Sequence, residues 1–150
     1  MFRSHRRGLT PSETLLVAAI TVAIALALFW RFTGEPGVEG RRVTITRVNT
    51  IMGALEKYAI DNGAVFPTTD QGLRALLAAP DQEPKPVEWR GPYLEDEQVL
   101  VDAWAVPLQY VSPGNDGRRY DLWSNGADRR EGGTDADADV QSWNRTTLIP

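Results

Sequence analysis

Hydrophobic residues form one long uninterrupted run near the N-terminus and shorter periodic groups after it. The run from Thr14 to Trp30 contains no charged residue. As a helix it would extend roughly 26 Å at about 1.5 Å per residue, close to the roughly 30 Å hydrocarbon core of a bilayer. We therefore predict one transmembrane helix. Glu13 stands directly before the run, where a carboxylate costs about 1 to 3 kcal/mol beside hydrocarbon and so needs a partner or a role.

The residues after this run show first a break and then a helical period. The segment RFTGEPGVEG combines three glycines with Pro36, a composition that ends or kinks a helix, so we predict a hinge over residues 32–40. Apolar residues then recur at steps of three and one on a single helical face: Val48, Ile51, Met52, Leu55, Tyr58 and Ala59. They predict an amphipathic helix over roughly 41–61, which the Asn62-Gly63 pair would end.

Shorter patterns predict a small domain of helix and sheet in the rest of the chain. Thr68 and Gln71 have the spacing of a capping box before a short helix that Pro80 would end. Residues 81–105 show no sustained period and predict an ordered loop with aromatic anchors. Apolar and polar residues alternate over 108–112 and 118–124 around PGNDG, which predicts a β-hairpin, and a last strand begins at Val140. The expected fold class is α+β, with a long N-terminal helix packed on a small antiparallel sheet.

Charge and composition narrow the classes of function. The first eight residues carry three arginines and no acid, which predicts a cytoplasmic N-terminus and an exported C-terminal domain. Beyond residue 30, 13 Lys and Arg stand against 19 Asp and Glu, an excess of six negative charges that argues against nucleic acid as a partner. Cysteine is absent and the only histidine is His5, so the domain cannot use thiolate, histidine-metal or Ser-His-Asp chemistry.

Two explanations of Glu13 remain open. Thr10, Pro11 and Glu13 match the first positions of a capping box. In the first explanation, Glu13 therefore accepts a free backbone N–H at the positive end of its own helix. The segment RRGLTPSE, a short basic leader and a glycine followed by an apolar residue, a threonine and a glutamate, also resembles the processing signal of the type IV pilin superfamily. The resemblance implies that a prepilin peptidase cleaves after Gly8 and methylates Leu9, and that Glu13 neutralises the terminal amine of a neighbouring subunit.

The loop from residue 124 to 143, SNGADRREGGTDADADVQSW, is rich in aspartate and glycine. Its hard oxygen donors suit calcium, and a solvated acidic loop is the alternative. It is not an EF-hand, because no glycine follows DADAD and Thr146 stands where a bidentate glutamate would close the loop.

Longer stretches carry a more specific resemblance over most of the chain. GAVFPTTDQGLRALLAAP, WRGPYLEDEQVLVDAWAVPLQYVSPG and YDLWSNGADRREGG, followed by the aspartate-rich end and Trp143, are similar to the major pseudopilins of the type II secretion system. DAWAVP places Ala103 and Ala105 where that family usually has proline and glycine. The resemblance implies a calcium ion held by aspartates and backbone carbonyls: Asn125, Asp128, Arg130, Asp137 and Asp139, with Asp135 as a further candidate.

The resemblance also implies a function and a division of the chain. The expected parts are a leader over 1–8, a transmembrane and assembly helix over 9–31, the hinge over 32–40 and a periplasmic domain over 41–150. Such a non-enzymatic subunit would polymerise from the bacterial inner membrane into a periplasmic pseudopilus that helps export folded proteins. Expected partners are further copies of the chain, minor pseudopilins, the inner-membrane assembly platform, the prepilin peptidase and, indirectly, the outer-membrane secretin complex. The alternatives are a type IV pilin, a minor pseudopilin or a membrane-anchored, carboxylate-dependent enzyme.

Overall fold

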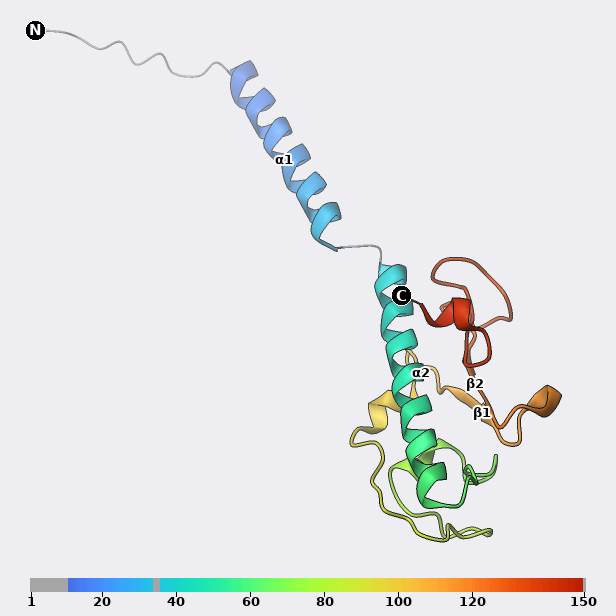
Figure 1. Ribbon diagram of the computed structural model, residues 1–150. Helices are drawn as coiled ribbons and strands as arrows, with labels where there is room; N and C mark the ends of the chain where they lie inside the picture. Colours follow the sequence, from blue (N-terminus) through green and yellow to red (C-terminus); the bar gives the residue numbers. More distant parts are fainter. Residues whose placement is uncertain (1–10, 34–35, 150) are drawn as a thin grey trace, which may run out of the picture. The chain divides into compact units, whose positions relative to one another are not determined.

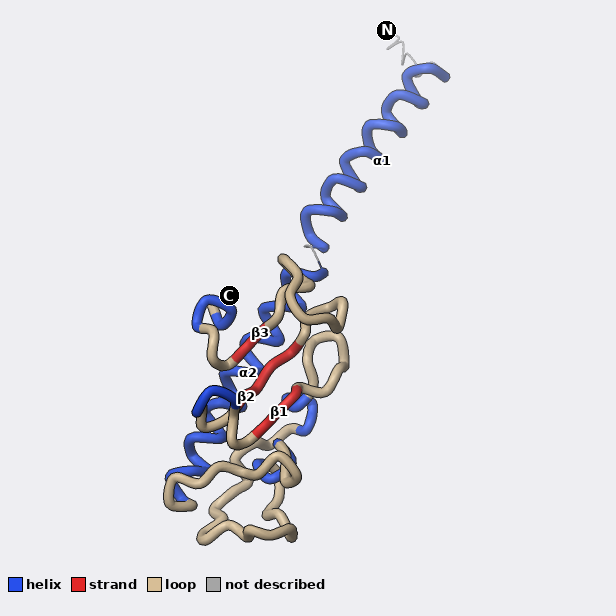
Figure 2. Tube along the Cα trace, turned by 90° about the vertical axis from the view of Figure 1, so that its right-hand side faces the viewer, coloured by secondary structure: helices blue, strands red, loops and turns tan. Residues whose placement is uncertain are grey.

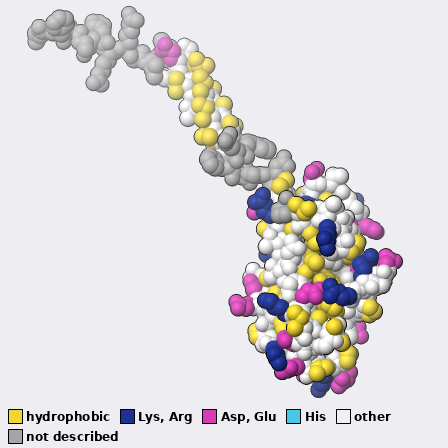
Figure 3. All heavy atoms as spheres, viewed as in Figure 1, with side chains coloured by type: hydrophobic (Ala, Val, Ile, Leu, Met, Phe, Trp, Pro, Cys, Tyr) yellow, Lys and Arg dark blue, Asp and Glu magenta, His cyan; other side chains and the backbone are white. Residues whose placement is uncertain are grey.

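A computed structural model describes residues 11–33 and 36–149. The chain forms two compact units, residues 1–35 and residues 36–150. The described part of the first unit is helix α1 (Pro11–Thr33), and Figure 3 shows hydrophobic side chains along it. The second unit contains helix α2 (Pro36–Asp61), a small sheet and several short 3-10 helices. The predicted leader lies outside the described residues.

Helix α2 begins five residues earlier than the period of its apolar face predicts. Pro36 is its first residue, where a missing N–H costs nothing, and Asp61 is its last, as expected. Residues 36–40 are therefore helical, although their glycines and proline predicted a hinge. A Cβ on Gly37 would lie 2.4 Å from Cβ of Ala136, and one on Gly40 would lie 3.0 Å from the Trp104 ring. These glycines permit close packing.

The predicted apolar face of α2 forms the centre of the core. Val48, Ile51 and Leu55 are fully buried, and Tyr58 and Ala59 nearly so, whereas Met52 is partly buried. The same cluster takes in buried residues of the following loops and of two strands: Leu76, Leu94, Leu108, Leu122 and Val140. All of these residues belong to the second unit, which thus has a hydrophobic core of its own.

The sheet has three antiparallel strands in the order β1-β2-β3, which Figure 2 shows side by side. Strands β1 (Gln109–Val111) and β2 (Asp121–Ser124) form the predicted hairpin, with Tyr110 opposite Leu122, and enclose a 3-10 turn, η3 (Asn115–Gly117). Strand β3 (Val140–Gln141) begins where predicted and pairs with the end of β2. Trp143 lies beyond β3, before the 3-10 helix η4 (Arg145–Leu148).

The segment between α2 and the sheet is held by side-chain hydrogen bonds more than by regular structure. The predicted capping box is present: the Thr68 N–H donates to Gln71 Oε1 at 2.9 Å, and the Gln71 N–H donates to Thr68 Oγ1 at 3.2 Å. The helix that follows is only the 3-10 turn η1 (Leu73–Leu76), and Gly72 before it has a φ of +60°, which interrupts any helix continuing from residues 68–71. Residues 81–105 form the predicted ordered loop, interrupted by the 3-10 turn η2 (Glu97–Leu100).

Candidate functional site

The N-terminal residues for which the sequence predicts a role lie partly within the described chain. The segment Pro11–Phe29 of α1 is long and apolar enough to cross a membrane. Glu13 lies exposed in the first turn of α1, next to the positive end of the helix dipole. Gly8, Leu9 and Thr10 lie outside the described residues, so the cleavage site and the first position of the capping box stay predictions.

The acidic loop between β2 and β3 is folded back on itself. Its ends are fixed by the pairing of Ser124 with Val140, and the N–H of Ala127 donates to the carbonyl of Ala136 at 3.1 Å. The carbonyl oxygen of Asp137 packs against two glycines. It would lie 2.5 Å from a Cβ at Gly126 and 2.4 Å from a Cβ at Gly133. Both glycines also have positive φ. The path of the loop therefore requires glycine at these positions for two reasons, the lack of space for a Cβ and the backbone conformation.

The predicted calcium ligands lie in different environments. Asn125 is half-buried and Asp139 is buried, and both line a cavity of about 250 Å³ beside the sheet. Asp128 is exposed, and its Oδ1 accepts the N–H of Arg130 at 3.0 Å. Asp137 is exposed as well. Over residues 11–33 and 36–149, no three acidic or histidine side chains lie close enough together to hold a metal ion. The aspartates of the loop are therefore less gathered than the sequence predicts.

Asp139 is the residue of this loop whose surroundings best fit a cation. Its Oδ2 accepts the N–H of Gly132 at 3.0 Å and the amide of Gln141 at 3.3 Å. Its Oδ1 is buried and has no hydrogen-bond partner among the described residues. A buried carboxylate oxygen without a partner costs on the order of 1–3 kcal/mol or more, a cost that a bound cation would offset. Calcium, which accepts carboxylate and carbonyl oxygens, fits this position.

The other side of the acidic loop packs on the first turns of α2. Ala136 fills the space beside Gly37, and Figure 1 draws the loop next to this end of the helix. Asp135 lines a separate cavity of about 330 Å³ together with α2 residues: Val38, Arg41, Arg42 and Ile45. Asp135 thus lines a different cavity from Asn125 and Asp139.

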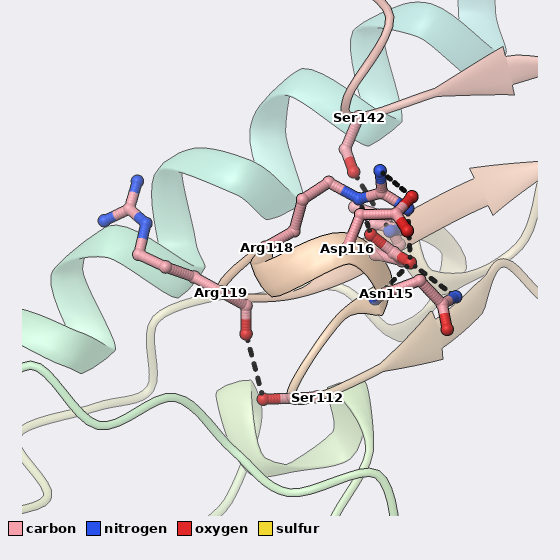
Figure 4. Close-up of polar contacts among 8 residues, drawn as sticks. Ser112, Asn115, Asp116, Arg118, Arg119 and Ser142 are labelled. Carbon is pink, nitrogen blue, oxygen red and sulfur yellow. Dashed lines mark hydrogen bonds and ion pairs between the residues drawn. The ribbon is translucent and has the colours of Figure 1, made fainter.

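A charged cluster at the hairpin turn was not anticipated from the sequence. The Asp121 carboxylate is only 1% exposed and accepts hydrogen bonds from the guanidinium of Arg118 and from both the backbone and side-chain nitrogens of Asn115. The bond from Arg118, and then those from Asn115, hold the pKa of Asp121 below its usual value although burial acts in the opposite direction. Figure 4 shows Arg118 pointing toward Asp116 and Asn115, while Arg119 points away.

Aromatic packing completes this cluster. The Arg118 guanidinium lies 4.8 Å from the ring centre of Trp143, and Trp143 meets Trp123 edge to face at 6.0 Å. Both tryptophans line the same cavity as Asp139. Arg118 and Asp121 are three residues apart in a segment predicted as a strand, where side chains at this spacing point to opposite faces, so the local pattern carried no signal for the ion pair.

An apolar helix long enough to cross a membrane, followed by an amphipathic helix packed on a small antiparallel sheet, is the arrangement of a pilin-like subunit. Residues 33–143 match the family model described as type II secretion system (T2SS), protein G. The chain therefore belongs to this family of pseudopilins, which are structural proteins and not enzymes.

Individual relatives agree with this assignment. The chain is 37% identical over 146 residues to the type II secretion system core protein G of Pseudomonas aeruginosa, covering 95% of this chain and 99% of that protein. It is 35% identical over 138 residues to that of Vibrio cholerae, covering 91% of each. The crystal structure of the major pseudopilin from the type 2 secretion system of enterohaemorrhagic Escherichia coli is similar, with a TM-score of 0.57 and 29% identity. That match covers 70% of this chain and 87% of the other.

Proposed function

We propose that this chain polymerises into the periplasmic pseudopilus of a type II secretion system and so helps to export folded proteins across the outer membrane. The main support is the match to core protein G relatives over nearly the whole chain. The apolar helix α1, followed by a globular unit with its own core, is the arrangement that a membrane-derived filament subunit needs.

The N-terminal segment directs insertion and assembly in this proposal. The basic leader stays in the cytoplasm, α1 crosses the inner membrane and the domain from residue 36 onward lies in the periplasm. A prepilin peptidase cleaves between Gly8 and Leu9 and methylates Leu9. Glu13 then compensates the terminal amine of a neighbouring copy as the α1 helices bundle, because neither charge is tolerated alone beside hydrocarbon.

The partners proposed for the chain follow from these steps of insertion, cleavage and assembly. They are further copies of the same chain, minor pseudopilins, the inner-membrane assembly platform and the prepilin peptidase. The outer-membrane secretin complex is an indirect partner, because the filament grows toward it.

Calcium is the cofactor that we propose for the acidic loop. The unpartnered Oδ1 of Asp139 supports it, as do the glycines that let the Asp137 carbonyl approach the neighbouring backbone. Bound calcium would supply positive charge to the acids of the loop, so the metal would stabilise the fold by mass action. Asn125, Asp128, Asp137 and the carbonyl of Arg130 are the further candidates to hold it with Asp139.

Secretion in the host bacterium tests the proposed function. A strain lacking this gene should fail to export the substrates of its type II system, and the full chain supplied from a plasmid should restore export. Overproduction should yield filaments visible by cryo-electron microscopy. A chain that is membrane-inserted and cleaved but is dispensable for export and forms no filaments would contradict the proposal.

A further inference from the structure

The globular unit presents one hydrophobic side chain almost fully to solvent. Val87 is 87% exposed, the highest exposed fraction among the large hydrophobic side chains that the structure describes. Its loop is held on both sides. The Gln71 amide donates to the Pro84 carbonyl at 2.8 Å, and on the other side the Glu88 N–H donates to Asn62 Oδ1 at 3.0 Å. Figure 1 draws this loop at the C-terminal end of α2. Val87 is therefore fixed in place at that end of the unit.

Two more exposed hydrophobic side chains make Val87 part of a distal patch. Val65 is 54% exposed and lines the same small cavity as Val87, and Ile60 in the last turn of α2 is 79% exposed. Single exposed hydrophobic residues are common, but several at one end of a unit indicate an interaction surface. The loop that carries Val87 is acidic over residues 81–88, with three acids against one lysine: Asp81, Glu83 and Glu88 against Lys85.

The first turns of α2 form a proximal socket at the opposite end of the unit. The socket is the cavity of about 330 Å³ in which Val38 and Ile45 supply apolar surface. Arg41, Arg42 and Asp135 also line it, so positive charge is in excess there. Within residues 11–33 and 36–149, no ion pair includes either of these arginines. The socket thus offers an apolar surface and unneutralised positive charge.

We propose that Val87 of one copy inserts into the proximal socket of a neighbouring copy in the filament. This inference rests on the proposed function and names surfaces by which the globular units stack. An open filament of identical subunits needs two different patches, because a patch that pairs with itself closes into a dimer. The distal patch and the proximal socket are different, and they lie at opposite ends of α2, a helix of 26 residues and so roughly 39 Å long.

The charges of the two surfaces are complementary. Glu88 directly follows Val87 and would lie beside the guanidinium of Arg42 when Val87 enters the socket. In the single chain Glu88 pairs with Arg90 at 2.8 Å, but both side chains are more than half exposed. Such a surface pair contributes little, so Glu88 can exchange it for Arg42 at small cost.

Filament formation by the full chain tests the contact. Val87→Asp places a carboxylate against Val38 and Ile45 and should reduce the number of filaments by about tenfold or more, because buried apolar anchors dominate interface energies. Melting of residues 36–150 should be unchanged, since the side chain is exposed in the single chain. Arg42→Glu should also reduce filaments, and Arg42→Glu combined with Glu88→Arg should restore them. Normal filaments from Val87→Asp would overturn the proposal.

Disulfide crosslinking identifies the two surfaces directly, because the chain contains no cysteine of its own. A chain with both Val38→Cys and Val87→Cys should form disulfide-linked multimers in overproducing cells, since the periplasm is oxidising. A bond within one chain is excluded, because the two positions lie at opposite ends of α2 and a disulfide requires Cα atoms within about 7 Å. Either single variant alone should stay monomeric, and cells producing both single variants should contain dimers.

The control pair is Val38→Cys with Asp116→Cys, since the Asp116 side chain is 86% exposed on the hairpin turn. It should stay monomeric. Disulfide dimers of Val87→Cys alone would show a patch that pairs with itself and would overturn the proposal. A chain with Val38→Cys and Val87→Cys that stays monomeric in cells with normal filaments would overturn it as well and leave the proposed function standing. An unmodified chain that forms no filaments would contradict the proposed function and this contact together.

Discussion

Ala105 has a backbone conformation that normally favours glycine. Its φ is +60°, in the turn where the Asp102 N–H donates to the Val106 carbonyl at 2.7 Å. A Cβ in this region costs about 1–2 kcal/mol, and glycine loses about 0.4–1 kcal/mol more chain entropy than alanine on folding. Ala105→Gly should therefore raise the free energy of unfolding by up to about 1 kcal/mol, measured by urea denaturation of residues 36–150.

The control for this substitution lies two residues away. Ala103 is not among the described residues with positive φ, so Ala103→Gly should lower stability by about 0.4–1 kcal/mol through entropy alone. The same sign of change at both positions would show that the turn relaxes without strain at Ala105.

Asp121 makes the stability of the domain depend on pH. Because its pKa is lower in the folded than in the unfolded chain, the unfolded chain takes up the proton first as the pH falls. This part of the stability is complete above the unfolded pKa of about 3.9 and is lost as the pH falls through the folded value. Asp121→Asn should lower the free energy of unfolding at pH 7 by roughly 1–3 kcal/mol and make its acid dependence shallower.

Thermal melts between pH 7 and pH 3 measure both effects. The matched control is Asp116→Asn, since Asp116 pairs with the same Arg118 but its side chain is 86% exposed. It should leave the pH profile nearly unchanged. A profile as steep in Asp121→Asn as in the unmodified domain would assign the acid sensitivity to other carboxylates.

At the scale of elements, the acidic loop has two adjacent glycines, and only Gly133 lacks space for a side chain. Gly132 and Gly133 both have positive φ, at +98° and +83°. A Cβ at Gly132 meets nothing within 4 Å, whereas one at Gly133 would lie 2.4 Å from the Asp137 carbonyl oxygen. Both alanine variants carry backbone strain of about 1–2 kcal/mol, and Gly133→Ala adds overpacking of about 1–3 kcal/mol. Urea denaturation of the domain should rank Gly133→Ala as clearly the less stable, and equal losses would mean that the loop moves freely.

Local patterns predicted the elements well. The apolar face of α2, the hairpin and the capping box of Thr68 and Gln71 depend on residues close in sequence, and the structure contains all three. The start of α2 was predicted wrongly because the role of Gly37 depends on Ala136, about a hundred residues later. Contacts of this range leave no period in the sequence.

At the scale of the whole molecule, substitution of Glu13 distinguishes its two possible roles, assembly with a neighbouring subunit and capping of α1. If it compensates a neighbour's amine, Glu13→Gln should leave the chain inserted and cleaved to begin at Leu9 but strongly reduce filament formation. If it only caps α1, the loss should be about 0.5–2 kcal/mol of local helix stability, with normal filaments. Intact mass of the membrane-purified chain checks the cleavage, and electron microscopy of overproducing cells counts filaments.

Ser12→Ala is the control, because it changes the same turn of α1 without altering charge. It should form filaments as the unmodified chain does. Abundant filaments from Glu13→Gln would favour the capping explanation.

The packing of Ala136 against Gly37 has a mechanical consequence. The covalent path from α1 enters the globular unit at the first turn of α2, which in an isolated helix would be the first part to fray. Here the loop covers this turn, and Arg41 adds a hydrogen bond to the carbonyl of Thr147 at 3.2 Å. A pull on the chain through α1 is therefore shared between the backbone of α2 and the C-terminal segments, so the end of the helix cannot unravel before those contacts slip.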